Sequence, residues 1–535
     1  MECRRSPGET DFRQGTLHRS PSLALAGDAQ GNPVRIAFPG YATSSAGFAA
    51  GRFFNSKPIL KIRTLLLASG AYGLAEVAMR LVQAATMFWV VAVCSKQTFG
   101  EIGLLISVQQ MVTLLALGGI VDALSGRISE RRSRGSISGL LVSTTRAFWL
   151  GSLIAILLYT VAYWLSPNGY FGATPALAHV CVVISGILFA RITLASSIER
   201  LQEKHRSAIA SKAIPTTTGF VMAAFAVVIE PPQFTYFLGL LAGAALGLLV
   251  LLLASRRESV EVHDLNLKEV SGLYVESFPF LVAALMAWAS GIGMNLFVGA
   301  FISATEVAEF TLVLSIISAV SMIPYAVNQV WYPRFLSVAQ GLPRDQLDQA
   351  NSAANRLTLF LLSLAASTII AFFVDVVSFI GGNISQYASI HGYLLVSLLS
   401  FVSLSLHYRS TNYYLLYRMG RTLMNLVTIA SIVSIAIWAV LILMMGVWGI
   451  YVGFLLANFL RSAVEYGDAR RRWKVSMDWV AMVWASALIT GSYALAVTVS
   501  SFGVRIAIFT GVVALLCVIF YLGNRTSTFK VDLHP

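Results

Sequence analysis

Apolar runs long enough to cross a bilayer follow one another through most of this chain. A hydrocarbon core of ~30 Å needs about 20 consecutive apolar residues in a helix, and residues 413–456 alone hold two such runs. Charged residues make up only 12% of the 535 residues, whereas soluble domains carry about 25%. The sequence therefore predicts an all-α, polytopic membrane protein.

The apolar runs predict fourteen transmembrane helices. They cover residues 66–93, 101–124, 139–164, 177–197, 209–229, 234–254, 278–301, 307–331, 357–380, 389–408, 422–445, 447–467, 477–499 and 503–523. The eleventh and twelfth spans meet at Gly446, which makes this the least distinct division.

The basic residues indicate how the spans are oriented. Lys and Arg gather before the first span and then in alternate loops, for example at 131–134 and 470–474, while the intervening segments hold only Lys96 and Arg505. Cytoplasmic loops retain Lys and Arg, so both termini are expected in the cytoplasm. The net charge of +13 is explained by these loops, and no nucleic-acid partner is expected.

The two ends of the chain differ from its centre. Residues 1–60 include "MECRRSPGETDFRQGTLHRS", a polar stretch rich in charge, Gly, Pro and Ser, which predicts a disordered cytoplasmic tail. This tail lacks the apolar core of a secretory signal. It is either a genuine tail or the result of a start codon placed too early. Residues 526–535 form a second, short cytoplasmic tail.

Motifs for catalysis or metal binding are missing from the sequence. Cys3, Cys94, Cys181 and Cys517 lie far apart without CxxC spacing, so neither a disulfide framework nor a metal site is predicted. No GxxxxGK[ST] phosphate loop occurs. The longest outer loop, at about 166–176, is too short to hold an outer catalytic domain. We expect no enzymatic activity and no cofactor.

Two stretches indicate an internal repeat. "TFGEIGLLIS" (98–107) and "EVAEFTLVLS" (306–315) align with a shift of 208 residues, so that Glu101 meets Glu309 and Ser107 meets Ser315. The repeat predicts a first six-helix lobe at 61–257, a second lobe at 258–467, and two added helices at 468–525. Repeated halves are common in secondary transporters, whose substrate site lies between them.

These stretches also carry a family resemblance. "TFGEIGLLIS" followed by "LGGIVDALSGRISE", and the later "FVGAFISATEVAEFTLVLSIISAVSMIPYAVNQVWYPRF", resemble the polysaccharide flippases (the O-antigen and exopolysaccharide, Wzx-like family) of the multidrug/oligosaccharidyl-lipid/polysaccharide exporter superfamily. The resemblance covers about residues 60–525. It implies an alternating-access flippase of polyprenyl-pyrophosphate-linked oligosaccharides, with two six-helix lobes around a polar cavity.

Charged residues lie near the middle of the first predicted span. Arg80 is about midway between Arg63 and Lys96, roughly 25 Å from each along a helix, where a charge costs about 2.5–3.5 kcal/mol. Glu76 and Arg80 have the i, i+4 spacing of an ion pair, and Gln83 continues their face. Either the pair locks helix packing, or Arg80 binds the pyrophosphate of a substrate while Glu76 holds or releases Arg80. A third alternative makes Glu76 the carrier of a coupling ion.

Other polar residues inside the spans have weaker assignments. Asn295, Asn328 and Gln329 either line the cavity or bridge helices. Positions at the membrane interface are expected for Lys212 and for the pair His407 and Arg409, while Asp375 is expected in solvent near the outer end of its span. Prolines in the fifth, seventh and eighth spans predict kinks that allow bending. They are Pro215, Pro279 and Pro324.

The sequence thus favours a flippase in a bacterial inner membrane that carries lipid-linked oligosaccharide for polysaccharide biosynthesis, such as lipopolysaccharide assembly or exopolysaccharide export. A polymerase or glycosyltransferases are the expected protein partners. Three alternatives remain. They are a cation-coupled antiporter of drugs or metabolites, a flippase of the peptidoglycan lipid precursor, and a scaffold or enzyme of polysaccharide synthesis.

Overall fold

Contacts divide the chain into residues 1–57 and residues 58–535, and the fold concerns the second unit. The computed structural model describes residue 75 and residues 78–121, 123–124, 138–165, 174–202, 204–254, 267–339, 342–417 and 419–526. The residues described form helices joined by short turns, and no strand is found among them. This confirms the predicted all-α class.

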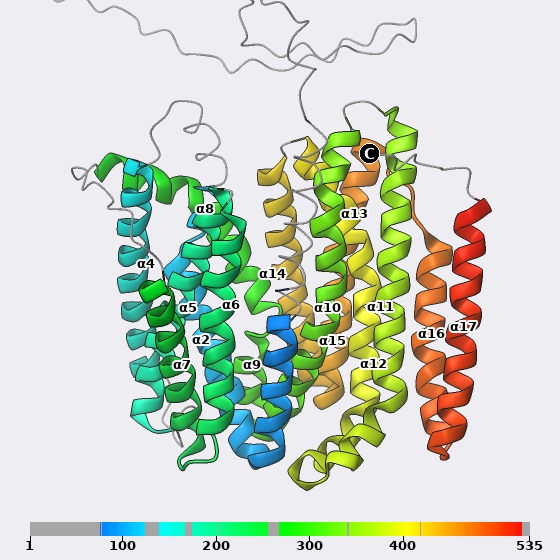
Figure 1. Cartoon of the computed structure of the whole chain (residues 1–535), viewed down its shortest axis with the longest axis horizontal. Coiled ribbons are helices and arrows are strands. Elements are labelled where there is room, and N and C mark those ends of the chain that lie inside the picture. Colours follow the sequence, from blue (N-terminus) through cyan, green and yellow to red (C-terminus); the bar gives the residue numbers. More distant parts are fainter. Residues whose placement is uncertain are drawn as a thin grey trace, which may run out of the picture. The chain divides into compact units, whose positions relative to one another are not determined.

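The helices of this unit run side by side (Figure 1). In the first half they are Ala78–Val93, α2 (Lys96–Leu117), α4 (Ser138–Leu165), α5 (Ala176–Leu201), α6 (His205–Ala226) and α7 (Pro232–Ala254). In the second half they are α8 (Leu267–Ala289), α9 (Met294–Phe301), α10 (Ala304–Val338), α11 (Arg344–Ile380), η1 (Gly382–Ile390), α12 (His391–Leu399), η2 (Ser400–Ser403), α13 (Leu404–Leu416), α14 (Gly420–Met445), α15 (Val447–Trp473), α16 (Trp479–Thr498) and α17 (Phe502–Thr526).

Eleven helices of the described part are long and apolar enough to cross a membrane. Two shorter apolar helices, Ala78–Val93 and Phe502–Val518, fall in the first and last predicted spans. The fifth predicted span contains α6, a helix of 22 residues that is not among the eleven. Every predicted span therefore contains a helix, and the count of fourteen crossings stays a prediction.

The seventh and tenth predicted spans are interrupted helices rather than continuous ones. The seventh consists of α8 and α9, separated by a turn at 290–293 that contains two glycines, residues that weaken a helix interior. The tenth passes from α12 through the 3₁₀ segment η2 into α13. In η2 the Ser400 and Ser403 hydroxyls donate to carbonyls three residues earlier. Such local bonds compete with regular helix geometry.

The two helices that carry the matching stretches of the predicted repeat, α2 and α10, pack directly on each other. Their N-caps are Ser95 and Ser303, which obey the same shift of 208 residues, and each hydroxyl accepts a bond from the backbone N–H three residues on. A Cβ at Gly100 would lie 1.8 Å from the Ala304 carbonyl oxygen, and one at Gly103 would lie 2.3 Å from Thr311 Oγ1. Only glycine permits this close crossing of α2 and α10.

Helix α8 packs in its first half against elements of the predicted first lobe. Val270 and Leu273 belong to a buried apolar cluster with residues of α2, α4 and α5, and the Tyr274 hydroxyl donates to the Ala147 carbonyl in α4. The three prolines expected to kink helices lie inside α6, α8 and α10.

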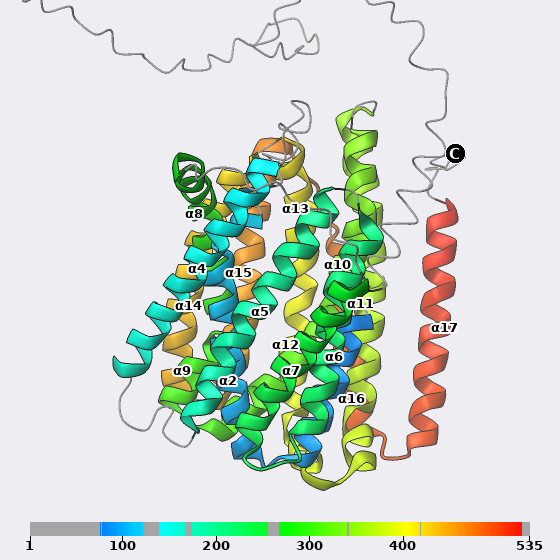
Figure 2. The ribbon, with the colours of Figure 1, turned by 60° about the vertical axis from the view of Figure 1, so that its left-hand side comes forward.

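The last helix lies at the edge of the bundle in both ribbon views (Figures 1 and 2). Arg505 of α17 forms two hydrogen bonds of 2.9 and 3.0 Å with the Asp375 carboxylate of α11. The expectation that Asp375 is simply solvated is therefore wrong, because α17 brings a cation to it. This ion pair attaches α17 to the helices of the predicted second lobe.

Candidate functional site

A cavity of about 620 Å³ lies among helices from both halves of the chain. Its walls come from the helix Ala78–Val93 and from α2, α5, α6, α7, α8 and α10. The lining combines apolar and aromatic side chains with a small set of polar groups, the composition usual for ligand sites. It contains residues on both sides of the predicted lobe boundary, as expected for a repeat-based transporter.

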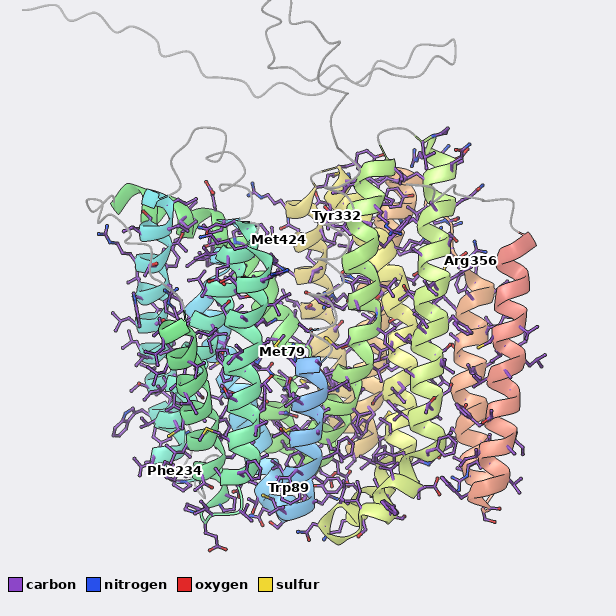
Figure 3. All side chains as sticks on the ribbon, in the orientation of Figure 1. Met79, Trp89, Phe234, Tyr332, Arg356 and Met424 are labelled. Carbon is purple, nitrogen blue, oxygen red and sulfur yellow. The ribbon has the colours of Figure 1, made fainter. Side chains whose placement is uncertain are left out.

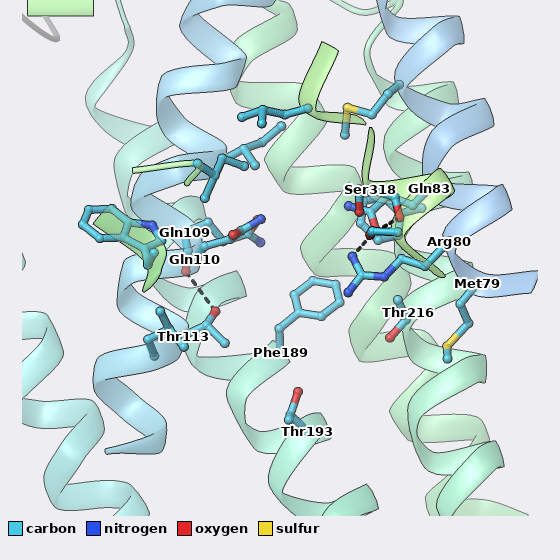
Figure 4. A pocket seen from close by; sticks show the side chains of 18 of the residues that line it. Met79, Arg80, Gln83, Gln109, Gln110, Thr113, Phe189, Thr193, Thr216 and Ser318 are labelled. Atoms are coloured by element: carbon cyan, nitrogen blue, oxygen red, sulfur yellow. Dashed lines mark hydrogen bonds between the residues drawn. The ribbon is translucent and has the colours of Figure 1, made fainter. Parts of the chain in front are cut away.

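Arg80 and Gln83 lie on one wall of this cavity. Arg80 is half-buried, and one of its Nη atoms donates to Gln83 Oε1 at 2.9 Å (Figure 4). Their i, i+3 spacing makes them neighbours on one helix face. The same helix carries Met79 near one end and Trp89 near the other (Figure 3), and Met79 also lines the cavity. Glu76, the predicted partner of Arg80, lies outside the described residues.

A second cation reaches the cavity from α6. Lys212 lines the wall together with Thr216 and Phe220, and these residues are spaced four apart on one helix face. The expectation of a membrane-interface position for Lys212 did not anticipate this. The spacing of Lys212 and Thr216 indicates a polar helix face. The sequence does not show whether such a face meets lipid, a neighbouring helix or a cavity.

The charge on the described part of this wall is positive. Arg80 and Lys212 are the charged residues among those that line the cavity, and the described lining contains no Asp or Glu. Charges of one sign in a cleft with low-dielectric walls concentrate ions of the opposite sign. The cavity is therefore suited to an anionic group.

Polar side chains of α2 form the opposite wall. Figure 4 shows Gln109, Gln110 and Thr113 across the cavity from Arg80, with Phe189 between the two walls. Gln109 is buried and donates from Nε2 to Ser185 Oγ at 2.8 Å, while the Thr113 hydroxyl bonds to the Gly186 carbonyl at 3.0 Å. These bonds fix α2 against α5. The sequence does not reveal this wall, because two adjacent glutamines in an apolar run carry no motif.

The remaining predicted site residues lie elsewhere. Asn295 is fully buried, and its Nδ2 donates to Ser107 Oγ at 3.0 Å and to Thr311 Oγ1 at 3.1 Å. It bridges α2 and α10 and is not among the cavity-lining residues. Asn328 is half-buried and lines a small hollow of about 10 Å³ between α10, α11 and α13. The side chain of Gln329 lies outside the described residues.

Arg409, which was expected at the membrane interface, lies in a buried cluster of charged residues. Its side chain is 0% exposed, and its Nη atoms donate to Asp478 at 2.7 Å, to Asp348 at 3.1 Å and to Ser476 Oγ at 2.6 Å. Its neighbour on the same helix, His407, contacts Glu465 of α15 at 2.5 Å. Arg409 thus joins α11 and α13 to the segment that leads into α16, and it does not reach the cavity.

At the end of the bundle that the loop charges predict to be outer, residues of α2, α10 and η1 contact one another. Lys96 Nζ lies 2.5 Å from Glu309 Oε1 and 5.5 Å from the centre of the Tyr387 ring. Phe99 meets the same ring edge-on at 6.4 Å between centroids. We call Lys96, Phe99, Glu309 and Tyr387 the outer clasp. Within the described residues, no group of three or more His, Cys, Asp or Glu is placed to hold a metal ion.

Known structures of similar fold are membrane transporters. The lipid II flippase MurJ in an inward closed conformation aligns with a TM-score of 0.66 and 14% identity over 85% of this chain and 99% of that one. A eukaryotic MATE transporter aligns at 0.56 with 13% identity over 80% and 99%. An inward-facing MATE multidrug transporter of the MOP superfamily aligns at 0.54 with 16% identity over 74% and 94%. At these identities the likeness concerns the fold.

The family assignment comes from the sequence. No curated protein matches the chain, but the sequence model of the family described as "Polysaccharide biosynthesis protein" matches residues 67–338. The match spans half of the chain and includes both stretches of the predicted repeat. It confirms the resemblance inferred from those stretches, and the chain belongs to the polysaccharide biosynthesis protein family.

Proposed function

We propose that the protein moves a polyprenyl-pyrophosphate-linked oligosaccharide from the cytoplasmic to the outer leaflet of a bacterial inner membrane. In this proposal both termini are cytoplasmic, and the glycan enters polysaccharide biosynthesis after crossing. The protein catalyses no covalent step. Family membership and the transporter fold of its structural neighbours support the transport class, and the cavity supports the chemistry of the cargo.

The observation that carries the proposal is the position of Arg80 and Lys212 on one cavity between helices of both repeats. A pyrophosphate is a compact group of multiple negative charge that must leave water to cross. Arg matches phosphate oxygens with a planar, bidentate fork, and Lys contributes a point charge. In a low-dielectric chamber both contacts are stronger than in water.

The remaining lining suits the rest of the cargo. Amide and hydroxyl groups, such as those of Gln83 and Thr216, can exchange hydrogen bonds with sugar hydroxyls. The change of cavity access from the cytoplasmic to the outer side would then consist of breaking the outer clasp and closing the opposite end around the bound headgroup. Polysaccharide polymerases or glycosyltransferases remain the proposed partners.

Transport in proteoliposomes tests the proposal. The probe is a short-chain polyprenyl diphosphate that carries a fluorescent disaccharide, and its appearance in the opposite leaflet is followed over time. Because a hydrogen bond to a charged group contributes about 1.5–3 kcal/mol, Arg80→Gln and Lys212→Gln should each slow transport about 10- to 100-fold, and Arg80→Lys should slow it less. Arg472→Gln, at an exposed ion pair with Asp468, is the control.

Transport at the wild-type rate by the double variant Arg80→Gln, Lys212→Gln would refute the proposal. Two further probes separate the alternatives. A cationic dye tests the antiporter alternative, which the described lining disfavours because it lacks carboxylates. A peptide-bearing lipid precursor tests the peptidoglycan alternative, and preferential transport of that probe would reassign the cargo.

A further inference from the structure

The cavity wall opposite Arg80 carries a tryptophan held in a fixed position. Trp288 lies near the end of α8 and is half-buried on the cavity. Its indole N–H donates to the Ser107 carbonyl of α2 at 3.1 Å. Since this bond uses its only polar group, what the side chain can offer a ligand is aromatic surface.

The turn after α8 fits the shape of this ring. A Cβ at Gly293 would lie 2.9 Å from Trp288 Cδ2 and Cε2, the two atoms at the ring junction. Only a glycine therefore lets the backbone pass so close to the indole. The turn is itself fixed, because the Ser107 hydroxyl donates to the Ile292 carbonyl at 2.9 Å. The ring is thus positioned in advance, which reduces the entropy lost when a ligand binds.

An amide that has no hydrogen-bond partner among the described residues lies one turn further along α2. Gln110 is half-buried on the same cavity, three residues after Ser107, and so lies on the same helix face. Within the described part of the chain, its amide makes no hydrogen bond. Its neighbour Gln109 differs, because that amide is already bonded to Ser185. Gln110 therefore has two N–H donors and a carbonyl acceptor to offer a ligand.

We propose that Trp288 and Gln110 form a glycan subsite that contacts the first sugars beyond the pyrophosphate. A pyranose has one face of C–H groups, which stacks on an aromatic ring, and a rim of hydroxyls, which pairs with an amide. The two walls then divide the cargo: Arg80 and Lys212 bind the phosphates, and Trp288 and Gln110 bind the sugar. This subsite rests on the proposed function and makes the cavity selective for glycosylated carriers.

The alternative is that Trp288 only packs α8 against α2. That role accounts for the N–H bond and the contact with Gly293. It does not account for the exposure of the ring to the cavity beside an amide with no partner in the described residues. The two roles differ in one measurable respect, since packing affects every ligand equally and a glycan subsite affects only ligands that carry a sugar.

Binding of two probes to the purified full-length protein distinguishes these roles. One probe is farnesyl diphosphate, and the other is farnesyl diphosphate linked to N-acetylglucosamine. If each contact contributes about 1 kcal/mol, Trp288→Ala and Gln110→Ala should each weaken binding of the glycosylated probe about fivefold and leave the bare probe unchanged. Trp288→Phe, which keeps an aromatic face, should retain most of the affinity.

The controls are Trp149→Ala, at a tryptophan 58% exposed on α4, and Gln346→Ala, at an exposed glutamine in α11. Both should bind the two probes as wild type does. Equal weakening of both probes by Gln110→Ala, or no weakening of either, overturns the subsite and leaves the proposed function in place. If the wild-type protein binds neither probe, the proposed function fails and the subsite fails with it. Gln110→Ala decides the matter even if Trp288→Ala does not fold.

Discussion

Arg80 and Arg409 lie in different environments, and local sequence does not show what surrounds them. Arg80 lines the cavity, whereas Arg409 is enclosed by Asp348 and Asp478 from two other segments. The sequence predicted that Arg80, near the middle of its span, needs a partner or water, whereas it placed Arg409 at the membrane interface. Their environments depend on groups far away in sequence, since Arg409 and Asp478 are 69 positions apart. The sequence around Asn295 likewise does not indicate that its partner is Ser107, which lies 188 positions away.

Replacement of Arg409 should lower stability sharply. Arg409→Met removes the cation between two carboxylates, and breaking a buried pair in this way costs about 3–5 kcal/mol. Thermal unfolding in detergent should show a large fall in the midpoint. Arg472→Met is the matched control, because its ion pair with Asp468 is 43% exposed on the arginine side and such pairs contribute about 0–1 kcal/mol. Equal shifts in the two variants would contradict this prediction.

At the scale of elements, the sequence predicted where helices lie better than where they break. Each predicted span contains a helix, because the length of an apolar run is sufficient to predict a membrane helix. The break between α8 and α9 was not predicted, because glycines also occur inside continuous membrane helices. It is maintained by tertiary bonds such as Ser107 to Ile292. The similarity of the two stretches likewise indicated a repeat, but it did not indicate that α2 and α10 contact each other.

The crossing of α2 and α10 should tolerate no added carbon. Gly100→Ala places a methyl group against the Ala304 carbonyl, so the two helices must separate at the clasped end. We expect a lower unfolding midpoint and easier opening of that end. Gly467→Ala in α15 is the control, because nothing lies within 4 Å of its added Cβ. Alanine should there be neutral or stabilise by up to about 1 kcal/mol. An unfolding midpoint for Gly100→Ala equal to that of wild type would show that the crossing adapts.

At the scale of the whole molecule, composition and the apolar runs predicted the fold class, and the repeat stretches indicated the family. They do not indicate where the two halves of the predicted repeat meet. The outer clasp shows one such contact, because Lys96 of α2 and Glu309 of α10 come from opposite halves. Glu309 and its repeat mate Glu101 also have different partners, since Glu101 accepts a bond from Gln233 of α7. The repeat is therefore not symmetric in its contacts.

Loss of the clasp should shift the protein toward an outward-open state. Lys96→Gln removes a charge-assisted bond that contributes roughly 1.5–3 kcal/mol. Cys94 is a native reporter, because it is buried and lies two residues before Lys96 of the clasp. In a background without the other cysteines, a membrane-impermeant maleimide added outside should label Cys94 at least tenfold faster in the variant. The charge exchange Lys96→Glu, Glu309→Lys should restore slow labelling. Slow labelling in Lys96→Gln itself would show that the pair does not control access.

The volume of the cavity limits what a single transport cycle can deliver. About 620 Å³ falls within the usual range for sites that enclose one small molecule. If the proposed function holds, a cavity of this volume can enclose a headgroup with its first sugars but not a long glycan. The cargo then crosses as separate short units, one for each transport cycle. Any lengthening of the glycan must then be completed by other proteins on the far side of the membrane.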